Sequence, residues 1–162
     1  MQFYTISEDY AEYLRGIDAS IPNIKGNGYK NPKPFIGIVL HIDDHRYVAP
    51  LTSPKEWHDS IKNSSPMYFK IHENGNPDHK LGLVNLKFMF PILDDYSSLI
   101  DLENHDDEKY QQLLYKQLEF IRPNSEKLGK KAALLRKLFF EGKVKGTCNF
   151  ASLEECYKKF RP

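Results

Sequence analysis

Residues 49–58 combine two hydroxyls, an ammonium group and an imidazole within one short segment, Ala-Pro-Leu-Thr-Ser-Pro-Lys-Glu-Trp-His. These are the groups needed to hold a phosphate and to transfer a proton. A proline on either side of the hydroxyl pair disfavours continuation of the preceding strand. We therefore expect Thr52 and Ser53 at the end of a strand, with Lys55 and His58 close behind.

These side chains also have structural alternatives. Ser and Thr are preferred at helix N-caps, and a proline such as Pro54 suits the first position of a helix. Thr52 or Ser53 would then only cap a short helix, and the spacing alone favours this role because capping hydroxyls far outnumber catalytic ones. His58, beside a tryptophan, would then only cover the edge of the sheet.

The length and composition fit one globular domain over residues 1–162. Hydrophobic residues make up 40% of the chain and charged residues 28%, which favours a folded core over disorder. No apolar run approaches the roughly 18 residues of a membrane span, and the N-terminus lacks the features of a signal peptide. Cys148 and Cys156 fit no metal spacing. We therefore expect a cytoplasmic protein with reduced thiols and no membrane partner.

The formal net charge is only +1, but the charges are segregated along the chain. Residues 94–108 contain seven acidic residues and no Lys or Arg, whereas residues 122–145 contain eight basic residues and two acidic ones. This segregation indicates either a positive face for a nucleic acid or the solvated surface of a helix.

The histidines do not predict a metal site. Of the six histidines, His41 and His45 are four residues apart, but they lie across a predicted hairpin and not on a helix, and they make only two ligands. Phosphate-binding glycine loops and nucleophile elbows are also absent from the sequence. We therefore expect neither a metal nor a cofactor.

RNA can be cleaved without a metal, because its own 2′-hydroxyl is the nucleophile. The protein then needs only a base, an acid and cations that stabilise the charged phosphorane. The side chains that could supply this set are Lys33, Lys55, Thr52, Ser53, Tyr10 and His58.

Closely spaced strands fill the first part of the chain. Apolar or alternating runs separated by turn residues predict strands at 2–6, 35–40, 47–51, 67–72, 81–86 and, as the last one, 88–92. Such short links imply antiparallel pairing, so we expect an antiparallel sheet curled into a small, strongly curved β-barrel.

Helical spacing predicts one early helix and three late ones. Ser7 is placed to cap the first helix. The others cover 110–121, 128–139 and a final segment opened by Asn149 or Ser152. Strands followed by helices make the fold class α+β.

A long loop separates the first helix from the first buried strand. Residues 18–34 contain three prolines and two glycines, and loops of this length are often functional. The end of the loop places an aromatic ring and two ammonium groups at the start of the strand, from Tyr29, Lys30 and Lys33.

Seven motifs, taken in order, resemble one family. They are Phe-Tyr-Thr-Ile (3–6), Asn-Pro-Lys (31–33), Phe-Ile-Gly-Ile-Val-Leu (35–40), Ala-Pro-Leu-Thr-Ser-Pro-Lys (49–55), Phe-Lys-Ile-His-Glu-Asn-Gly (69–75), Leu-Gly-Leu-Val-Asn-Leu (81–86) and Gly-Thr-Cys-Asn-Phe (146–150). Together they make residues 2–160 resemble the ToxN/AbiQ family of toxins from type III toxin–antitoxin systems.

The resemblance implies a barrel related to the MazF and CcdB toxins and a metal-independent endoribonuclease. Such an enzyme prefers adenine-rich sites in cellular or phage mRNA and leaves a 2′,3′-cyclic phosphate and a 5′-hydroxyl. The implied partner is a small RNA pseudoknot antitoxin that the toxin cuts from a repeat precursor. Family members form closed rings of alternating protein and RNA, several with three copies of each, and act in growth inhibition or abortive infection.

The resemblance also implies particular site residues. Thr52, Ser53 and Lys55 match the active-site segment, Lys33 matches a lysine entering the buried strand, and Tyr10 matches a groove tyrosine. Chemically, lysines would balance the charge of the phosphate and hydroxyls would bind its oxygens. A lysine of lowered pKa, the same tyrosine or the nearby histidine could be the general base. The residues expected to bind RNA, with Tyr115 the weaker match, are Tyr29, Lys30, Tyr115, Arg122, Lys127, Lys130 and Lys131.

Two alternatives from other functional classes remain open. The chain could be a barrel that binds RNA without cleaving it, or a CcdB-type inhibitor whose partner is a protein such as gyrase. Cleavage of adenine-rich RNA in the presence of EDTA distinguishes a nuclease from the first alternative. Co-purification with a discrete small RNA argues against the second.

Overall fold

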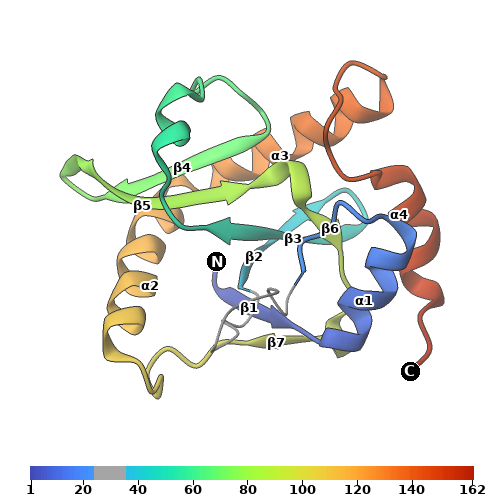
Figure 1. The fold of residues 1–162 in the computed structure, drawn as a ribbon, viewed down its shortest axis with the longest axis horizontal. Helices are drawn as coiled ribbons and strands as arrows, with labels where there is room; N and C mark the ends of the chain where they lie inside the picture. The colour runs from blue at the N-terminus through green and yellow to red at the C-terminus, as the bar shows by residue number, and fades with distance from the viewer. Residues whose placement is uncertain (24–35) are drawn as a thin grey trace.

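The computed structural model describes residues 1–23 and 36–162 (Figure 1). The strands are β1 (Phe3–Ile6), β2 (Gly37–Ile42), β3 (His45–Thr52), β4 (Tyr68–Glu73), β5 (Asn76–Asn85), β6 (Phe90–Pro91) and β7 (Ser97–Leu99). The α-helices are α1 (Glu8–Ile17), α2 (Glu108–Ile121), α3 (Ser125–Phe140) and α4 (Phe150–Cys156). Short 3₁₀ helices are η1 (Glu56–Ser60), η2 (Leu86–Phe88), η3 (Asp94–Tyr96), η4 (Arg122–Asn124) and η5 (Tyr157–Lys159). This order confirms the predicted α+β class.

The strands form one bent antiparallel sheet in the order β4-β5-β3-β2-β1-β7. Two partners share one edge of β3: Leu51 and Thr52 pair with β5, whereas Tyr47 and Val48 pair with β6. Among the described residues the end strands β4 and β7 do not pair, so the sheet is open and the expected barrel is not confirmed.

Helix α2 holds the β4–β5 hairpin at one end of the sheet. It packs against β4 and β5 and stands beside their hairpin in Figure 1. The Asn74 side-chain amide in the hairpin turn donates to the carbonyl of Glu119 at 3.0 Å, and Gln117 Nε2 donates to the carbonyl of Leu81 at 2.8 Å. The β4–β5 hairpin is therefore tied to α2 both at its turn and along β5.

The hairpin between β2 and β3 is confirmed as predicted. Its turn lies at residues 43–44, and Asp43 adopts a positive φ of 51°. Gly37 lets the two strands approach closely, because a Cβ there would lie 2.3 Å from Cγ2 of Val48. The strands bury Ile38, Leu40 and Val48 completely or almost completely.

Two details of the predicted strands are wrong: the start of the strand at 81–86, and the prediction that the strand at 88–92 is the last one. β5 begins at Asn76 rather than at Leu81, because its first part pairs only with β4 in a two-stranded arm. Pro77 is tolerated there since its missing N–H faces no third strand. The segment predicted as the last strand is followed by β7, whose three residues pair with β1.

The helix caps follow local side-chain chemistry. Ser7 accepts a hydrogen bond from the Tyr10 N–H at 3.3 Å, which confirms the predicted cap of α1. Asn149, not Ser152, caps α4, because its side chain accepts from the Ser152 N–H at 3.1 Å. In the described part of the chain, no helix is long and apolar enough to cross a membrane.

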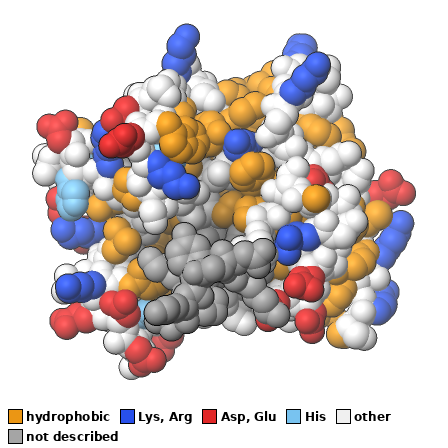
Figure 2. Space-filling model, viewed as in Figure 1, with side chains coloured by type: hydrophobic (Ala, Val, Ile, Leu, Met, Phe, Trp, Pro, Cys, Tyr) orange, Lys and Arg blue, Asp and Glu red, His pale blue; other side chains and the backbone are white. Residues whose placement is uncertain are grey.

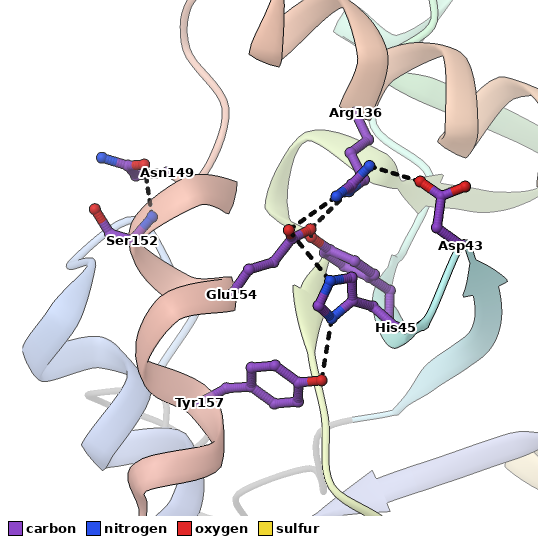
Figure 3. A network of polar contacts seen from close by, with 8 residues as sticks. Asp43, His45, Arg136, Asn149, Ser152, Glu154 and Tyr157 are labelled. Carbon is purple, nitrogen blue, oxygen red and sulfur yellow. Dashed lines mark hydrogen bonds and ion pairs between the residues drawn. The ribbon is translucent and has the colours of Figure 1, made fainter.

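A polar network, here called the clamp, joins the β2–β3 hairpin to α3 and α4 (Figure 3). Arg136 of α3 donates to both carboxylate oxygens of Glu154, at 2.6 and 2.9 Å, and to Asp43 at 2.8 Å. His45 contacts Glu154 at 3.4 Å, and the Tyr47 hydroxyl also donates to this carboxylate. Within the clamp the guanidinium therefore has two anionic partners.

Candidate active site

The hydroxyl pair lies where β3 ends. Thr52 is the final residue of β3 and is half-buried, and Ser53 follows it as an exposed residue. The helix η1 starts only at Glu56 with Lys55 at its N-cap, so neither hydroxyl caps it. In the described part of the chain neither hydroxyl makes a hydrogen bond. The cap alternative is therefore wrong, and within the described residues both hydroxyl oxygens lack a partner.

A small cleft of about 140 Å³ opens beside these hydroxyls. Thr52 and Ser53 form one wall, and Tyr110 and Gln117 of α2 contribute to the other. Burial, and then the neighbouring Asp107 carboxylate, raise the pKa of the Tyr110 phenol, so it stays protonated as a possible donor. Gln117 is 5% exposed, and its Oε1 has no partner among the described residues.

A larger cleft of about 350 Å³, here called the basic cleft, lies on the other side of the same segment. Pro54 belongs to its wall, although the preceding serine lines the small cleft. Four ammonium groups and one carboxylate line it, from Lys70, Lys80, Lys127, Lys131 and Asp59. On the face seen in Figure 2, lysine and arginine side chains stand around a central hollow together with hydrophobic ones.

The two clefts are separated by a thin backbone wall. Gly82 of β5 lines the basic cleft and has a φ of +131°. A Cβ built there would lie 2.5 Å from the Thr52 carbonyl oxygen and 3.5 Å from Gln117 Nε2. Thr52 and Gln117 line the small cleft, so the walls of the two clefts meet at this glycine.

His58 faces the basic cleft in a defined protonation state. Its Nδ1 accepts the Lys55 N–H at 3.2 Å, so the neutral ring carries its proton on Nε2. Burial, and then the ammonium groups of Lys55 and Lys70, lower the pKa of this imidazole. A neutral ring with a protonated Nε2 is a hydrogen-bond donor there, which does not suit a general base.

Tyr10 lies in the core and not on a groove. It is fully buried, its ring stacks on Tyr96 at 5.1 Å, and its hydroxyl donates to the Pro91 carbonyl at 3.3 Å. Burial raises the pKa of this phenol far above its usual range. The prediction that it takes part in catalysis is therefore not supported by its position.

The other predicted residues are scattered. Lys55 is exposed, and like Tyr115 of α2, which is 40% exposed, it lines neither cleft. Arg122 donates through Nε to the Met1 carbonyl at 3.2 Å. Lys33, Tyr29 and Lys30 lie outside the described residues.

The basic segment is not one uniform positive face. Lys127, Lys130 and Lys131 line an open groove on α3, and the first and last of them also reach the basic cleft. Lys130 is paired with Glu126 at 2.6 Å, whereas Arg136 belongs to the clamp. Of the basic residues expected to face RNA, those that line a groove or cleft therefore lie in the N-terminal half of α3.

Comparison with known proteins identifies the family. A family model described as the toxin ToxN of type III toxin–antitoxin systems matches residues 2–158. The chain belongs to the ToxN family. This confirms the resemblance predicted from the ordered motifs.

ToxN relatives match over nearly their whole length. The chain is 55% identical over 160 residues to Endoribonuclease ToxN from Pectobacterium atrosepticum, covering 99% of this chain and 94% of the relative. A solved structure from work on a processed non-coding RNA that regulates a bacterial antiviral system has 54% identity, full coverage of both chains and a TM-score of 0.93. Another, concerning selective toxin inhibition by a non-coding RNA pseudoknot, has 26% identity, coverage of 98% and 96%, and a TM-score of 0.76.

Some site residues of this ToxN-family chain were missed from sequence. Lys70 alternates with the buried Phe69 and Ile71, a signal that its ammonium faces away from their side of β4. Lys80 and Gln117 had no such signal, because only the packing of β5 and α2 brings them to the clefts. Among the described residues no group of three or more His, Cys, Asp or Glu could hold a metal ion.

Proposed function

We propose that this ToxN-family chain is an endoribonuclease that cleaves RNA with the RNA's own 2′-hydroxyl as nucleophile. The single observation that carries the proposal is the 55% identity, over 99% of the chain, to a relative named Endoribonuclease ToxN. The hydroxyls at the end of β3, which have no hydrogen-bond partner among the described residues, and a nearby cleft rich in lysines support the proposal, because they are the groups that this chemistry needs.

The reaction is a transesterification at phosphorus. The 2′-oxygen attacks the adjacent phosphate, and the bond from phosphorus to the 5′-oxygen breaks. The 2′-hydroxyl loses its proton to a base, and the leaving 5′-oxygen gains one from an acid. The products are a 2′,3′-cyclic phosphate and a 5′-hydroxyl, and the protein need not bind a metal.

The residues at the β3 exit have distinct roles in this reaction. Thr52 and Ser53 donate hydrogen bonds to a non-bridging phosphate oxygen, on which charge grows in the transition state. Lys55 balances that charge as a compact cation. Lys33 remains part of the proposed set as a second cation. The buried Tyr10 and the Nε2-protonated His58 are not assigned as the base.

The proposed substrates and partners follow the ToxN relatives. We infer a preference for adenine-rich RNA, inhibition by a small RNA pseudoknot processed by the toxin, and a closed protein–RNA ring in the cytoplasm. The solved relatives support this, since they concern inhibition by a non-coding RNA pseudoknot and regulation of an antiviral system by a processed RNA. Growth inhibition or abortive infection by phage is the proposed biological result.

The test is cleavage of an adenine-rich RNA in EDTA, followed by analysis of the product ends. We expect cyclic phosphate and 5′-hydroxyl ends. Loss of cleavage with EDTA and its return with Mg²⁺ or Mn²⁺ would contradict the metal-free mechanism. Sequencing RNA that co-purifies with the protein tests the partner, and a single discrete species is the expected result.

A further inference from the structure

The basic cleft carries more positive charge than the protein itself neutralises. Its one carboxylate, Asp59, is ion-paired with Lys80. In the described part of the chain, Lys70, Lys127 and Lys131 have no carboxylate partner within salt-bridge distance. Three ammonium groups around one cavity form a site for an anion.

Lys131 is fixed in position. Its Nζ donates to the carbonyls of Asn63 at 2.8 Å and Tyr68 at 2.7 Å. These neutral acceptors orient the ammonium group without cancelling its charge. Burial, and then the nearby ammonium groups of Lys127 and Lys70, lower the pKa of Lys131, so the three cations are close enough to repel one another. A bound anion would relieve that repulsion.

His58 independently indicates a ligand. His58 is only 5% exposed, and its ring lines the basic cleft. Nδ1 is occupied by the Lys55 N–H, and the remaining Nε2 has no partner among the described residues. A buried donor without an acceptor is unfavourable, so Nε2–H is matched to an acceptor that residues 1–23 and 36–162 do not supply.

The cleft also has room and surfaces for more than an anion. Its volume of about 350 Å³ falls in the range of small-molecule sites. The rings of His72 and Phe120, 4.3 Å apart, line it together with the amide of Asn124. Aromatic faces and an amide suit a nucleobase, which can stack and form hydrogen bonds.

We propose that the basic cleft is a nucleotide subsite for the RNA residue next to the cleaved bond. The phosphate binds Lys70, Lys127 and Lys131, and His58 donates from Nε2 to an acceptor of the same nucleotide. The subsite rests on the proposed nuclease function, because Pro54 and Gly82 place it directly beside the cleft of Thr52 and Ser53.

The first experiment measures binding without cleavage. The probe is a fluorescent adenine-rich oligonucleotide with 2′-fluoro sugars, which lacks the attacking hydroxyl. The test variant is Lys70→Gln with Lys127→Gln, and the matched control is Lys137→Gln with Lys158→Gln, two exposed lysines outside the cleft. For the test variant we expect the slope of log affinity against log salt to fall by about 0.7 for each phosphate that the protein no longer neutralises.

A second pair of variants separates the two nitrogens of His58. His58→Asn retains an acceptor for the Lys55 N–H but loses the distal donor, whereas His58→Gln retains an N–H near the position of Nε2. We expect the Asn variant to fold, as judged by its melting temperature, and to bind the probe more weakly than the Gln variant. A purely structural histidine would give two folded variants with equal affinity.

The outcomes separate this inference from the nuclease proposal. Wild-type protein that cuts RNA, while the double lysine variant binds the probe like its control, would overturn the subsite and leave the nuclease standing. Wild-type protein that neither cuts RNA nor binds the probe would overturn both.

Discussion

The two halves of α3 use positive charge in opposite ways. In the C-terminal half, Arg136 is held by Glu154 and Asp43, and the clamp links three parts of the fold. In the N-terminal half, Lys127 and Lys131 face cavities and have no carboxylate partner among the described residues. The same helix thus pairs its charge within the fold at one end and, among the described residues, leaves two lysines without a carboxylate partner at the other.

This contrast shows that charge density alone does not mark an RNA surface. Residues 122–145 form one basic segment in the sequence, but its cations differ in whether they are paired with a carboxylate. The charge of a cation in a bidentate ion pair with a carboxylate is already neutralised within the fold. A cation held only by neutral carbonyls, as Lys131 is, retains its charge for another molecule.

The largest expected effect is on catalysis at the β3 exit. Ser53→Ala and Lys55→Ala should each lower single-turnover cleavage by about 10²–10³-fold, or ~2.7–4 kcal/mol, because donors to a developing oxyanion act on the rate. The melting temperature should change little, since neither side chain has a hydrogen-bond partner among the described residues.

The controls for these variants are Ser64→Ala and Lys62→Ala, exposed residues of the following loop. They should cut at the wild-type rate. A folded Ser53→Ala protein with near-native turnover would show that the hydroxyl is not catalytic and would move the assignment to Lys33 or Thr52.

Breaking the clamp should affect stability instead. Arg136→Met leaves the largely buried Glu154 without its main partner and should lower the free energy of unfolding by about 3 kcal/mol. Denaturant unfolding measures this loss. Lys137→Met, on the same helix but exposed, should change stability by no more than about 0.5 kcal/mol. Equal effects of the two substitutions would remove the distinction between the halves of α3.

Charge reversal in the N-terminal half should affect RNA affinity with little change in stability. Lys127→Glu with Lys130→Glu should weaken binding of the antitoxin RNA, and the salt slope should fall by roughly 0.7–0.9 for each phosphate left without its lysine. Lys131 is left intact, because a carboxylate there would face two backbone carbonyls. Unchanged affinity and slope would mean that these lysines form only a solvated surface.

The smallest expected effect is a change in acid stability. Burial alone would raise the pKa of Glu154, but hydrogen bonds from Arg136 and Tyr47 outweigh it and lower this pKa. The carboxylate therefore contributes stability that is present above its unfolded pKa of about 4.3 and is lost as pH falls through the lower folded pKa.

Glu154→Gln should accordingly flatten the fall in unfolding free energy below about pH 4.5. Urea unfolding at several pH values, with Glu12→Gln at an exposed position of α1 as the control, measures the difference. A variant that loses stability with acid as steeply as the wild type does would show that the clamp carboxylate does not contribute to acid unfolding.

Local features of the fold were predictable from sequence, whereas closure of the sheet was not. The β2–β3 hairpin and the Ser7 cap depend on neighbouring residues, and both are confirmed. Whether the sheet closes depends on how β5 and β6 share one edge of β3 and on where α2 packs. Local sequence patterns do not determine these contacts, because they join segments that are far apart in the chain.

In the candidate site, too, residues that are adjacent in the sequence were predictable, whereas residues brought together by folding were not. The segment 52–58 was identified because its residue types are adjacent in the chain. Lys70, Gly82 and Gln117 come from β4, β5 and α2, and only folding brings them beside it. Tyr10 shows the reverse case, since the family resemblance implied a groove tyrosine, whereas the helical face of Tyr10 places it in the core.

Gly82 has a consequence for how such a protein could be inactivated by mutation. It has no functional group, but any side chain there would collide with the Thr52 carbonyl in a backbone conformation that other residues rarely adopt. In a genetic selection for cells that survive expression of this protein, we expect missense mutations at Gly82 as well as at Thr52 and Ser53. Such a variant would keep the lysines of the basic cleft, whereas the end of β3 would be displaced. We therefore expect it to bind RNA without cutting it.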